Sequence, residues 1–281
     1  MIFKGLRWLR GGRSASQRFP EGLAPWRVVC ASIAGSSHQR FGQPSQDAAG
    51  WALGPERSLI VAVADGAGSA KLGGEGARLA VSTAVNHLIN RRSLGSGESN
   101  KKDLITALER ARSALASEAE DRGVDIRELA TTLILLQATH ESVTALQVGD
   151  GSAVIEDRQN GVTGLTKPQV GEYVNETIFI TAEDAMDRVE TATHLGAPSG
   201  GAVFSDGLQL LALKMPEGTP HTPFFEPLFQ FVSTATDAQA ADEELQSFLT
   251  SPRVTSQTTD DLTLVLFSRD DDLAAHQDGS G

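Results

Sequence analysis

The chain has 281 residues, 24 basic against 36 acidic side chains, a net charge of −12 and one cysteine, Cys30. The acidic excess argues against a nonspecific nucleic-acid-binding protein, which must neutralise phosphates, and no apolar stretch approaches the roughly 18–20 residues of a membrane-spanning helix. A single cysteine excludes an intrachain disulfide and a zinc cluster built on cysteines. It fits a reducing compartment, so we expect a cytoplasmic protein.

The charge is unevenly distributed, because residues 1–20 carry five basic side chains and no acidic one. We predict a basic, poorly ordered segment over residues 1–25 and an acidic, disordered tail over residues 269–281. An alternative for the first segment is a weak contact with an anionic membrane surface or with a partner, since its apolar residues alternate with bases. Residues 26–268 then form one domain.

The first half of this domain contains two strands and a pair of helices. A strand is predicted over residues 26–33 and is followed by a polar loop that ends at Asp47. Residues 59–64, LIVAVA, are typical of a strand that is buried on both faces. Helices are expected from about residue 75 to 90, where apolar residues recur with the helical period, and from Asn100, an N-cap residue, to the glycine at position 123.

The second half contains more strands and a second helix pair. Strands are expected at residues 131–137, 143–148, 153–156, 177–181, 202–204 and 262–267, and helices at residues 208–214, 225–232 and 237–249. Strands and helix pairs are thus segregated along the chain. This order predicts an α+β fold, a four-layer α-β-β-α sandwich in which two antiparallel β-sheets stack and helix pairs lie outside.

Aspartates stand where several of these strands end or begin. They are Asp47, Asp65, Asp150, Asp206, Asp260 and Asp261. An ionised carboxylate at the end of a buried strand needs a partner, because desolvating a charge costs several kcal/mol. If the strand ends converge on one edge of the sandwich, the acids form a cluster that requires cations, and oxygen ligands alone select magnesium or manganese rather than zinc.

Individual members of this set also fit roles that need no metal. Asp-Gly is a common hairpin turn, and this alternative stays open for Asp150 because a strand resumes directly after it. A solvated surface acid can account for Asp260 or Asp261 taken singly. The glycine-rich loop after Asp65 matches neither a dinucleotide fingerprint nor a phosphate-binding P-loop. Its glycines instead allow the backbone to approach a metal, so that the Gly66 carbonyl can serve as a ligand.

Five segments, in order and spacing, resemble the metal-dependent serine/threonine protein phosphatases of type 2C, and in particular bacterial members. The segments are Ser45-Gln46-Asp47-Ala48, Val63-Ala64-Asp65-Gly66-Ala67-Gly68, Val148-Gly149-Asp150-Gly151, Phe204-Ser205-Asp206-Gly207-Leu208 and Asp260-Asp261-Leu262-Thr263. The resemblance covers about residues 26–268. The fold that it implies, a β-sandwich flanked by helix pairs, agrees with the predicted order of elements.

The resemblance also implies roles for individual residues. Asp65 bridges two metal ions, the Gly66 carbonyl and Asp47 complete one side, and Asp206 and Asp260 bind the other metal. Asp150 matches the acid that helps to hold a third ion in bacterial members. Asp65 and Asp206 then act in catalysis through a water molecule activated by two Mn²⁺ or Mg²⁺ ions.

Three positions depart from the family pattern. Ser45 and Gln46 stand where many members have Asn or an acid, and Ala67 stands where eukaryotic members have a histidine that protonates the leaving group. Arg40 is a candidate phosphate ligand, although its spacing differs from that of the family's arginine and a solvated loop residue is the alternative. His38, in the same loop, is either an acid or orienting group for Asp47 or a surface contact.

The resemblance implies hydrolysis of phosphoserine and phosphothreonine in proteins, with two metal ions or three. Expected partners are phosphorylated proteins and a serine/threonine kinase with its targets, and we expect a monomer. The alternative is a weak or silent phosphatase-like module that binds phosphoproteins or regulates a kinase. We place the substrate-shaping flap of this family between residues 157 and 176.

Overall fold

The computed structural model describes residues 7–8, 26–91, 98–169 and 177–269. Most of the expected basic segment and nearly all of the expected acidic tail lie outside these residues. Arg7 and Trp8 form a short strand, β1, which pairs with Gly50 and Trp51. No helix in the described part of the chain is long and apolar enough to cross a membrane.

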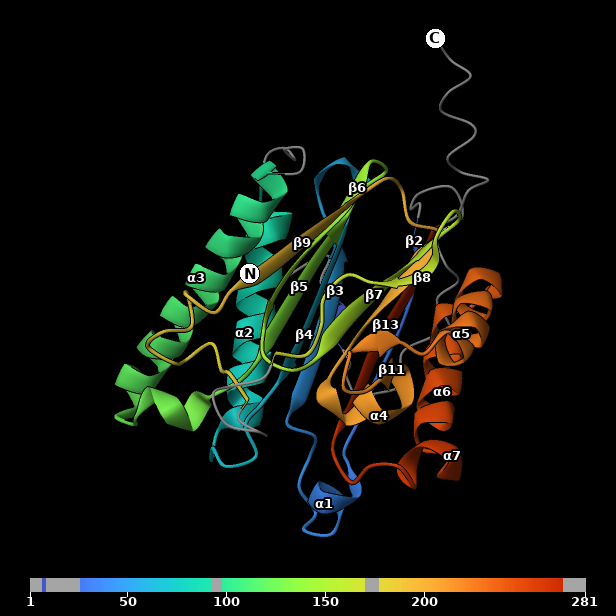
Figure 1. Cartoon of the computed structure of the whole chain (residues 1–281). Helices are drawn as coiled ribbons and strands as arrows, with labels where there is room; N and C mark the ends of the chain where they lie inside the picture. The colour runs from blue at the N-terminus through green and yellow to red at the C-terminus, as the bar shows by residue number, and fades with distance from the viewer. Residues whose placement is uncertain (1–6, 9–25, 92–97, 170–176, 270–281) are drawn as a thin grey trace.

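Two antiparallel sheets form the centre of the molecule (Figure 1). In the first sheet the strand order is β1 (Arg7–Trp8), β3 (Asp47–Leu53), β4 (Leu59–Asp65), β5 (Leu133–Ala138), β6 (Ser142–Val148) and β9 (Glu190–Leu195). In the second sheet it is β2 (Trp26–Ile33), β13 (Leu262–Arg269), β10 (Gly200–Phe204), β7 (Ser152–Asp157) and β8 (Gly161–Gly164). A small hairpin pairs β11 (Leu213–Lys214) with β12 (Thr219–Pro220).

Alternation along the strands builds three hydrophobic layers. In β4, Leu59, Val61 and Val63 face the second sheet, whereas Ile60 and Ala62 face the helices that cover the first sheet. In β13, Phe267 lies between the sheets and packs edge-on against Trp26 at 5.9 Å. Side chains that alternate between two apolar faces explain why these strands are continuous apolar runs in the sequence.

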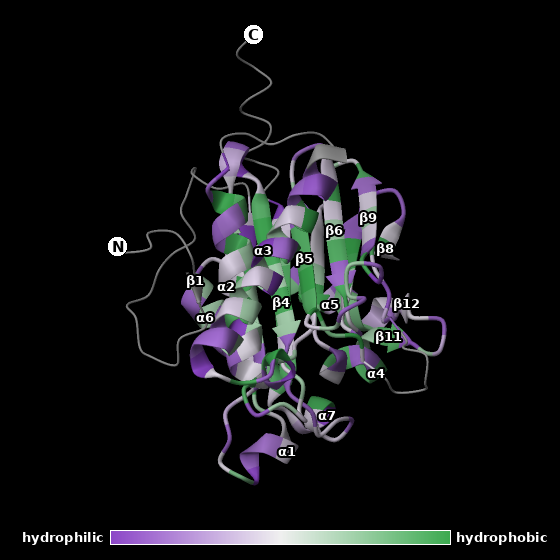
Figure 2. Ribbon diagram, turned by 90° about the vertical axis from the view of Figure 1, so that its left-hand side faces the viewer, coloured by the Kyte–Doolittle hydropathy of each residue, from purple (hydrophilic) through white to green (hydrophobic). Residues whose placement is uncertain are grey.

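Helix pairs cover the two outer faces, as Figure 1 shows. Helices α2 (Gly73–Ile89) and α3 (Glu98–Arg122) pack on the first sheet, and α5 (Thr222–Thr234) and α6 (Ala238–Leu249) pack on the second. Strands β4 and β5 form a hydrophobic surface beneath α2 and α3 (Figure 2). The predicted α-β-β-α sandwich of two antiparallel sheets is therefore confirmed.

Short helices occupy the connections between the layers. They are α1 (Ser36–Gln39), α4 (Gln209–Ala212) and α7 (Pro252–Thr255), with single 3-10 turns at Pro55–Arg57, Ile126–Leu129 and Asp206–Leu208. The helix predicted at residues 208–214 is therefore shorter than expected, because Leu213 begins the small hairpin.

One predicted strand is wrong. Residues 177–181 form coil and turn. Their apolar pattern reflects burial instead, since Ile180 is inaccessible to solvent and packs into the core beneath α2 and α3. The strand that pairs with β6 on the side away from β5 is β9, whose sequence ETATHL is largely polar because it lies at the edge of the sheet. Strands β3 and β8 also carry too weak a local pattern to be predicted.

Candidate metal centre

The predicted acids come from both sheets. Asp47 is the first residue of β3 and Asp65 the last residue of β4, and the two are directly paired across the antiparallel ladder. Asp150 lies in the turn between β6 and β7, which belong to different sheets. Asp206 follows β10, and Asp260 stands shortly before β13. The strand pairing therefore brings residues that are far apart in the sequence to one edge of the sandwich.

Three of these acids meet in space. One carboxylate oxygen each from Asp65, Asp150 and Asp206 lies within 4.8 Å of the other two. All three side chains are partly exposed, so an ion can reach them from solvent. The predicted convergence is thus present in the described residues for half of the proposed metal ligands.

The other three proposed ligands surround this group. Asp47 is buried and lies directly opposite Asp65 in the ladder between β3 and β4. Asp260 is exposed, and its negative charge reaches both Asp150 and Asp206. Gly66 follows Asp65 directly and is buried, and a Cβ at this position would lie 2.3 Å from the carbonyl carbon of Gly73. Close packing against the start of α2 thus requires a glycine here.

Crowding strongly perturbs these acids. Burial raises the pKa of Asp206 to about 8, and the negative charges of Asp150, Asp260 and Asp47 add to the effect. Burial also raises the pKa of Asp47 to about 7, against the hydrogen bond from Ser205. The pKa of Asp65 is raised well above its usual value by burial and then by Asp47, Asp206 and Asp150. Since carboxylates repel one another here, a bound cation would relieve the repulsion.

The oxygen atoms of the site are those that a hard divalent cation prefers. Asp47 uses Oδ2 to accept a hydrogen bond of 2.7 Å from Ser205 Oγ, and Asp150 uses Oδ2 to accept one of 2.7 Å from Thr177 Oγ1. The second oxygen of each carboxylate, Oδ1, is buried without a hydrogen-bond partner. Buried polar atoms seldom stay unpaired. Free, oriented oxygens without nitrogen or sulfur ligands fit Mg²⁺ or Mn²⁺.

The turn that carries Asp150 is fastened to the segment after β8. The side-chain amide of Gln147 donates to the carbonyls of Gly149 and Gly151 at 2.9 Å and to that of Lys167 at 2.7 Å. Gln169 accepts from the Gly149 amide at 2.7 Å. These two glutamines were missed in the sequence, although a glutamine on the fully buried strand β6, next to apolar residues, is a signal that could have found Gln147.

The loop before β3 carries three more residues that the sequence singled out, Arg40, His38 and Gln46. Arg40 is exposed at the end of α1, so its role as a phosphate ligand stays a prediction. His38 contacts Asp261, with 2.8 Å between Nδ1 and Oδ1. With its amide nitrogen turned towards them, Gln46 donates to the carbonyls of Gly66 at 3.1 Å and Ala67 at 3.3 Å. Gln46 therefore supplies a hydrogen-bond donor where an acid would supply a carboxylate.

Comparison with known proteins agrees with this geometry. The family described as protein phosphatase 2C matches residues 34–250. Serine/threonine-protein phosphatase 3 of Escherichia coli K12 is 40% identical over 249 residues, which cover 86% of this chain and 97% of that protein.

Solved structures share the fold at lower identity. Phosphatase Stp1 from Staphylococcus aureus is 13% identical, with a TM-score of 0.61 over 86% of this chain and 94% of that one. The catalytic domain of phosphatase PstP, solved in complex with two manganese ions, is 16% identical, with a TM-score of 0.58 over 86% and 97%. The chain belongs to the protein phosphatase 2C family and is a metal-dependent serine/threonine protein phosphatase.

Proposed function

We propose that the carboxylate cluster at the sandwich edge is the catalytic metal centre and that it removes phosphate from phosphoserine and phosphothreonine in proteins. The observation that carries this proposal is the meeting of Asp65, Asp150 and Asp206 within 4.8 Å. Manganese ions are bound by the related phosphatase PstP and magnesium by the structurally similar protein RsbX, and either ion suits the oxygen ligands found here.

Two ions would be held by this set of acids. Asp65 would serve both, Asp47 and the Gly66 carbonyl would complete the ligands of one, and Asp206 and Asp260 those of the other. Asp150, which is oriented by Thr177, holds a third and looser ion. Divalent cations at such a site act as Lewis acids, which lower the pKa of a water molecule and neutralise charge on the phosphoryl oxygens.

Two further residues, Cys30 and Arg40, bear on the reaction. Cys30 is buried at 4% exposure between the two sheets, so it is out of reach of a phosphoprotein and no cysteinyl-phosphate forms. Arg40 is the proposed phosphate ligand, since its guanidinium can pair with two phosphate oxygens at once. The exposed position of Arg40 leaves its side chain free to turn towards a substrate.

Turnover with and without metal tests this proposal. Hydrolysis of p-nitrophenyl phosphate and of a phosphothreonine peptide is expected to require Mn²⁺ or Mg²⁺, to stop with EDTA and to return when metal is restored. Asp65→Asn is expected to remove several orders of magnitude of kcat in a protein that folds normally. Full activity of Asp65→Asn would overturn the site assignment.

The same assay separates the enzyme from a silent phosphoprotein-binding module. A silent module would bind the phosphopeptide and release no phosphate at any metal concentration. The predicted kinase partner, the monomeric state and the cytoplasmic location stay predictions from the sequence and its resemblance.

A further inference from the structure

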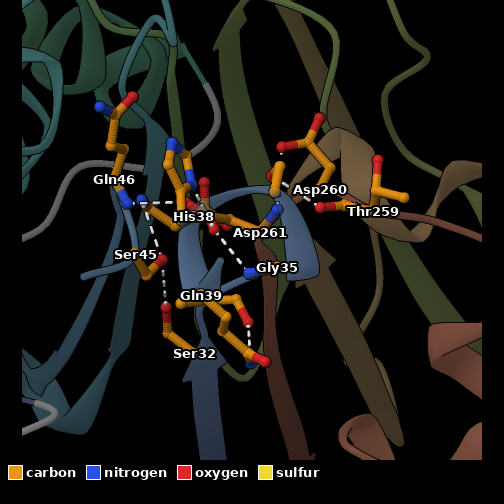
Figure 3. A network of polar contacts seen from close by, with 12 residues as sticks. Ser32, Gly35, His38, Gln39, Ser45, Gln46, Thr259, Asp260 and Asp261 are labelled. Carbon is orange, nitrogen blue, oxygen red and sulfur yellow. Dashed lines mark hydrogen bonds and ion pairs between the residues drawn. The ribbon is translucent and has the colours of Figure 1, made fainter. Parts of the chain in front are cut away.

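The loop between β2 and β3 crosses from the second sheet to the first, and both of its ends meet one carboxylate. Asp261 Oδ1 accepts hydrogen bonds from the Gly35 amide at 2.7 Å and from His38 Nδ1 at 2.8 Å. Asp261 Oδ2 accepts from the Gln46 amide at 2.6 Å. Asp261 itself is 2% exposed. Figure 3 shows this carboxylate at the centre of the polar network.

We propose that Asp261 is a positioning residue, whose carboxylate closes the loop 35–46 and thereby holds Asp47 and Gly66 in place at the metal centre. This inference rests on the proposed function of that centre. Asp261 acts through Gln46, which precedes Asp47 in the chain. Gln46 also contacts Gly66 twice, because its carbonyl accepts from the Gly66 amide at 3.3 Å and its side-chain amide donates to the Gly66 carbonyl.

The two adjacent aspartates, Asp260 and Asp261, therefore have different roles. The charge of Asp260 acts on Asp206 and Asp150, whereas the carboxylate of Asp261 turns to the loop. Asp260 lies in a bend and Asp261 directly precedes β13, so the chain changes direction between the two carboxylates. The backbone amide of Asp261 donates a hydrogen bond to Asp260 Oδ1 at 2.8 Å, which connects the two residues.

Close backbone packing supports the same attachment. A Cβ on Gly35 would lie 2.2 Å from the carbonyl carbon and oxygen of Asp260, so the loop lies directly against this backbone. Ser37 adds two hydrogen bonds to the Thr259 carbonyl, from its amide at 3.0 Å and from its hydroxyl at 2.7 Å. The start of the loop and the segment that carries Asp260 thus form one unit.

The network requires a group that only accepts hydrogen bonds. An ionised carboxylate offers about four lone-pair sites and no donor, whereas an asparagine side chain has an NH₂ group on one side. In Asp261→Asn, at least one of the three donors therefore faces another donor. Leaving a buried backbone N–H unpaired has a substantial cost, so one end of the loop is expected to detach.

Asp261→Asn in the full chain tests the proposal, with Asp242→Asn as its matched control. Asp242 on α6 accepts from the Cys30 amide of β2 at 2.9 Å, so both variants remove a carboxylate that binds the backbone. Hydrogen exchange followed by mass spectrometry is expected to show faster exchange at Gly35 and Gln46 only in Asp261→Asn. Mn²⁺ titrated by calorimetry is expected to bind about 10- to 100-fold more weakly, as for other groups that orient metal ligands.

The Mn²⁺ dependence of turnover separates a positioning role of Asp261 from a purely structural one. In Asp261→Asn, kcat for p-nitrophenyl phosphate is expected to recover as Mn²⁺ is raised, whereas Asp242→Asn shows the wild-type Mn²⁺ dependence throughout. The proposal is overturned if Asp261→Asn binds Mn²⁺ as tightly as wild type, or if both variants weaken it equally. Wild-type protein without metal-dependent turnover would instead refute the proposed function.

A second variant covers the case in which Asp261→Asn does not fold. His38→Ala removes one of the three donors and keeps both backbone hydrogen bonds of the carboxylate. It is expected to fold, to speed amide exchange in the loop and to weaken Mn²⁺ binding by less than about tenfold. Unchanged exchange and unchanged Mn²⁺ binding in this variant would overturn the proposal.

Discussion

Strand β7 has an aspartate near each of its ends, and the two differ in almost every physical respect. Asp150 stands before the strand, and burial raises its pKa while its Oδ1 lacks a partner. Asp157 ends the strand, and backbone donors lower its pKa, chiefly the Gln159 amide at 2.6 Å. Asp157 Oδ2 also lies 2.8 Å from His194 Nε2.

The difference indicates which kind of strand-end aspartate is suited to bind a metal ion. The chain itself supplies Asp157 with backbone donors and places His194 beside it, so this carboxylate is already satisfied in its turn. Asp150 has one hydroxyl donor, from Thr177, and shares its end of the sandwich with several acids. A cation is the partner that the chain does not supply at that end.

The largest expected effect comes from replacing an acid of the cluster, Asp206, by its amide. Asp206→Asn is expected to lower kcat for p-nitrophenyl phosphate by several orders of magnitude, because it removes a charge that the metal ions need. Asp157→Asn is the matched control and should keep the wild-type kcat. The comparison between the two ends fails if both variants lose activity to the same degree.

A smaller effect is expected from the hydroxyl that orients Asp150. Thr177→Val keeps the shape of the side chain but removes the donor to Asp150 Oδ2. Mn²⁺ affinity, measured by calorimetry, should fall by about tenfold, as for other groups that orient metal ligands. Thr163→Val on β8 provides a threonine control outside the cluster, and an equal loss there would argue against a specific role for Thr177.

After metal removal, the acids of the cluster should make the free energy of unfolding fall as the pH rises. The folded state raises the pKa of Asp206 to about 8 from an unfolded value of about 3.9, so it holds more protons than the unfolded state between these values. In EDTA, the free energy of unfolding should therefore fall as the pH rises through this window. Thermal unfolding, followed by circular dichroism, measures this change in the free energy of unfolding.

Metal binding should reverse this loss, because Mn²⁺ replaces the protons on the carboxylates. The difference in Tm between the Mn²⁺-loaded and the chelated protein should widen from about pH 5 to about pH 8. A difference that stays constant over this range would show that the acids do not exchange protons for metal.

The smallest effect is expected at Asp157, at the other end of β7. Its contribution to the free energy of unfolding should fall as the pH falls, opposite to that of Asp206. The pKa of Asp157 is lowered in the folded state, so its contribution is present above the usual value of about 3.9 and is lost as the pH falls through the lowered pKa. Asp157→Asn should therefore lose less stability on acidification than the wild type does. Identical acid unfolding curves would show that its turn contributes nothing measurable.

Local patterns in the sequence were sufficient for the main elements and for the acids. The apolar run of β4 and the helical period of α2 predicted a strand and a helix that the structure contains. The five aspartate segments predicted the family, because their order and spacing are properties of the chain alone. Strand and helix patterns depend on neighbours in the sequence, and motif order depends on the chain alone, so both can be predicted from the sequence.

Tertiary structure decided the rest, for reasons of long-range contact. The pattern at residues 177–181 predicted a strand, yet those residues fill a gap in the core, and the polar edge strand β9 took their expected place. The resemblance to the family singled out Asp150 and Asp260, but the donors that surround Asp150, Asp157 and Asp261 come only from folding. Burial and hydrogen bonding of a carboxylate are set by residues distant in the chain, so a sequence identifies the acids and the fold assigns their roles.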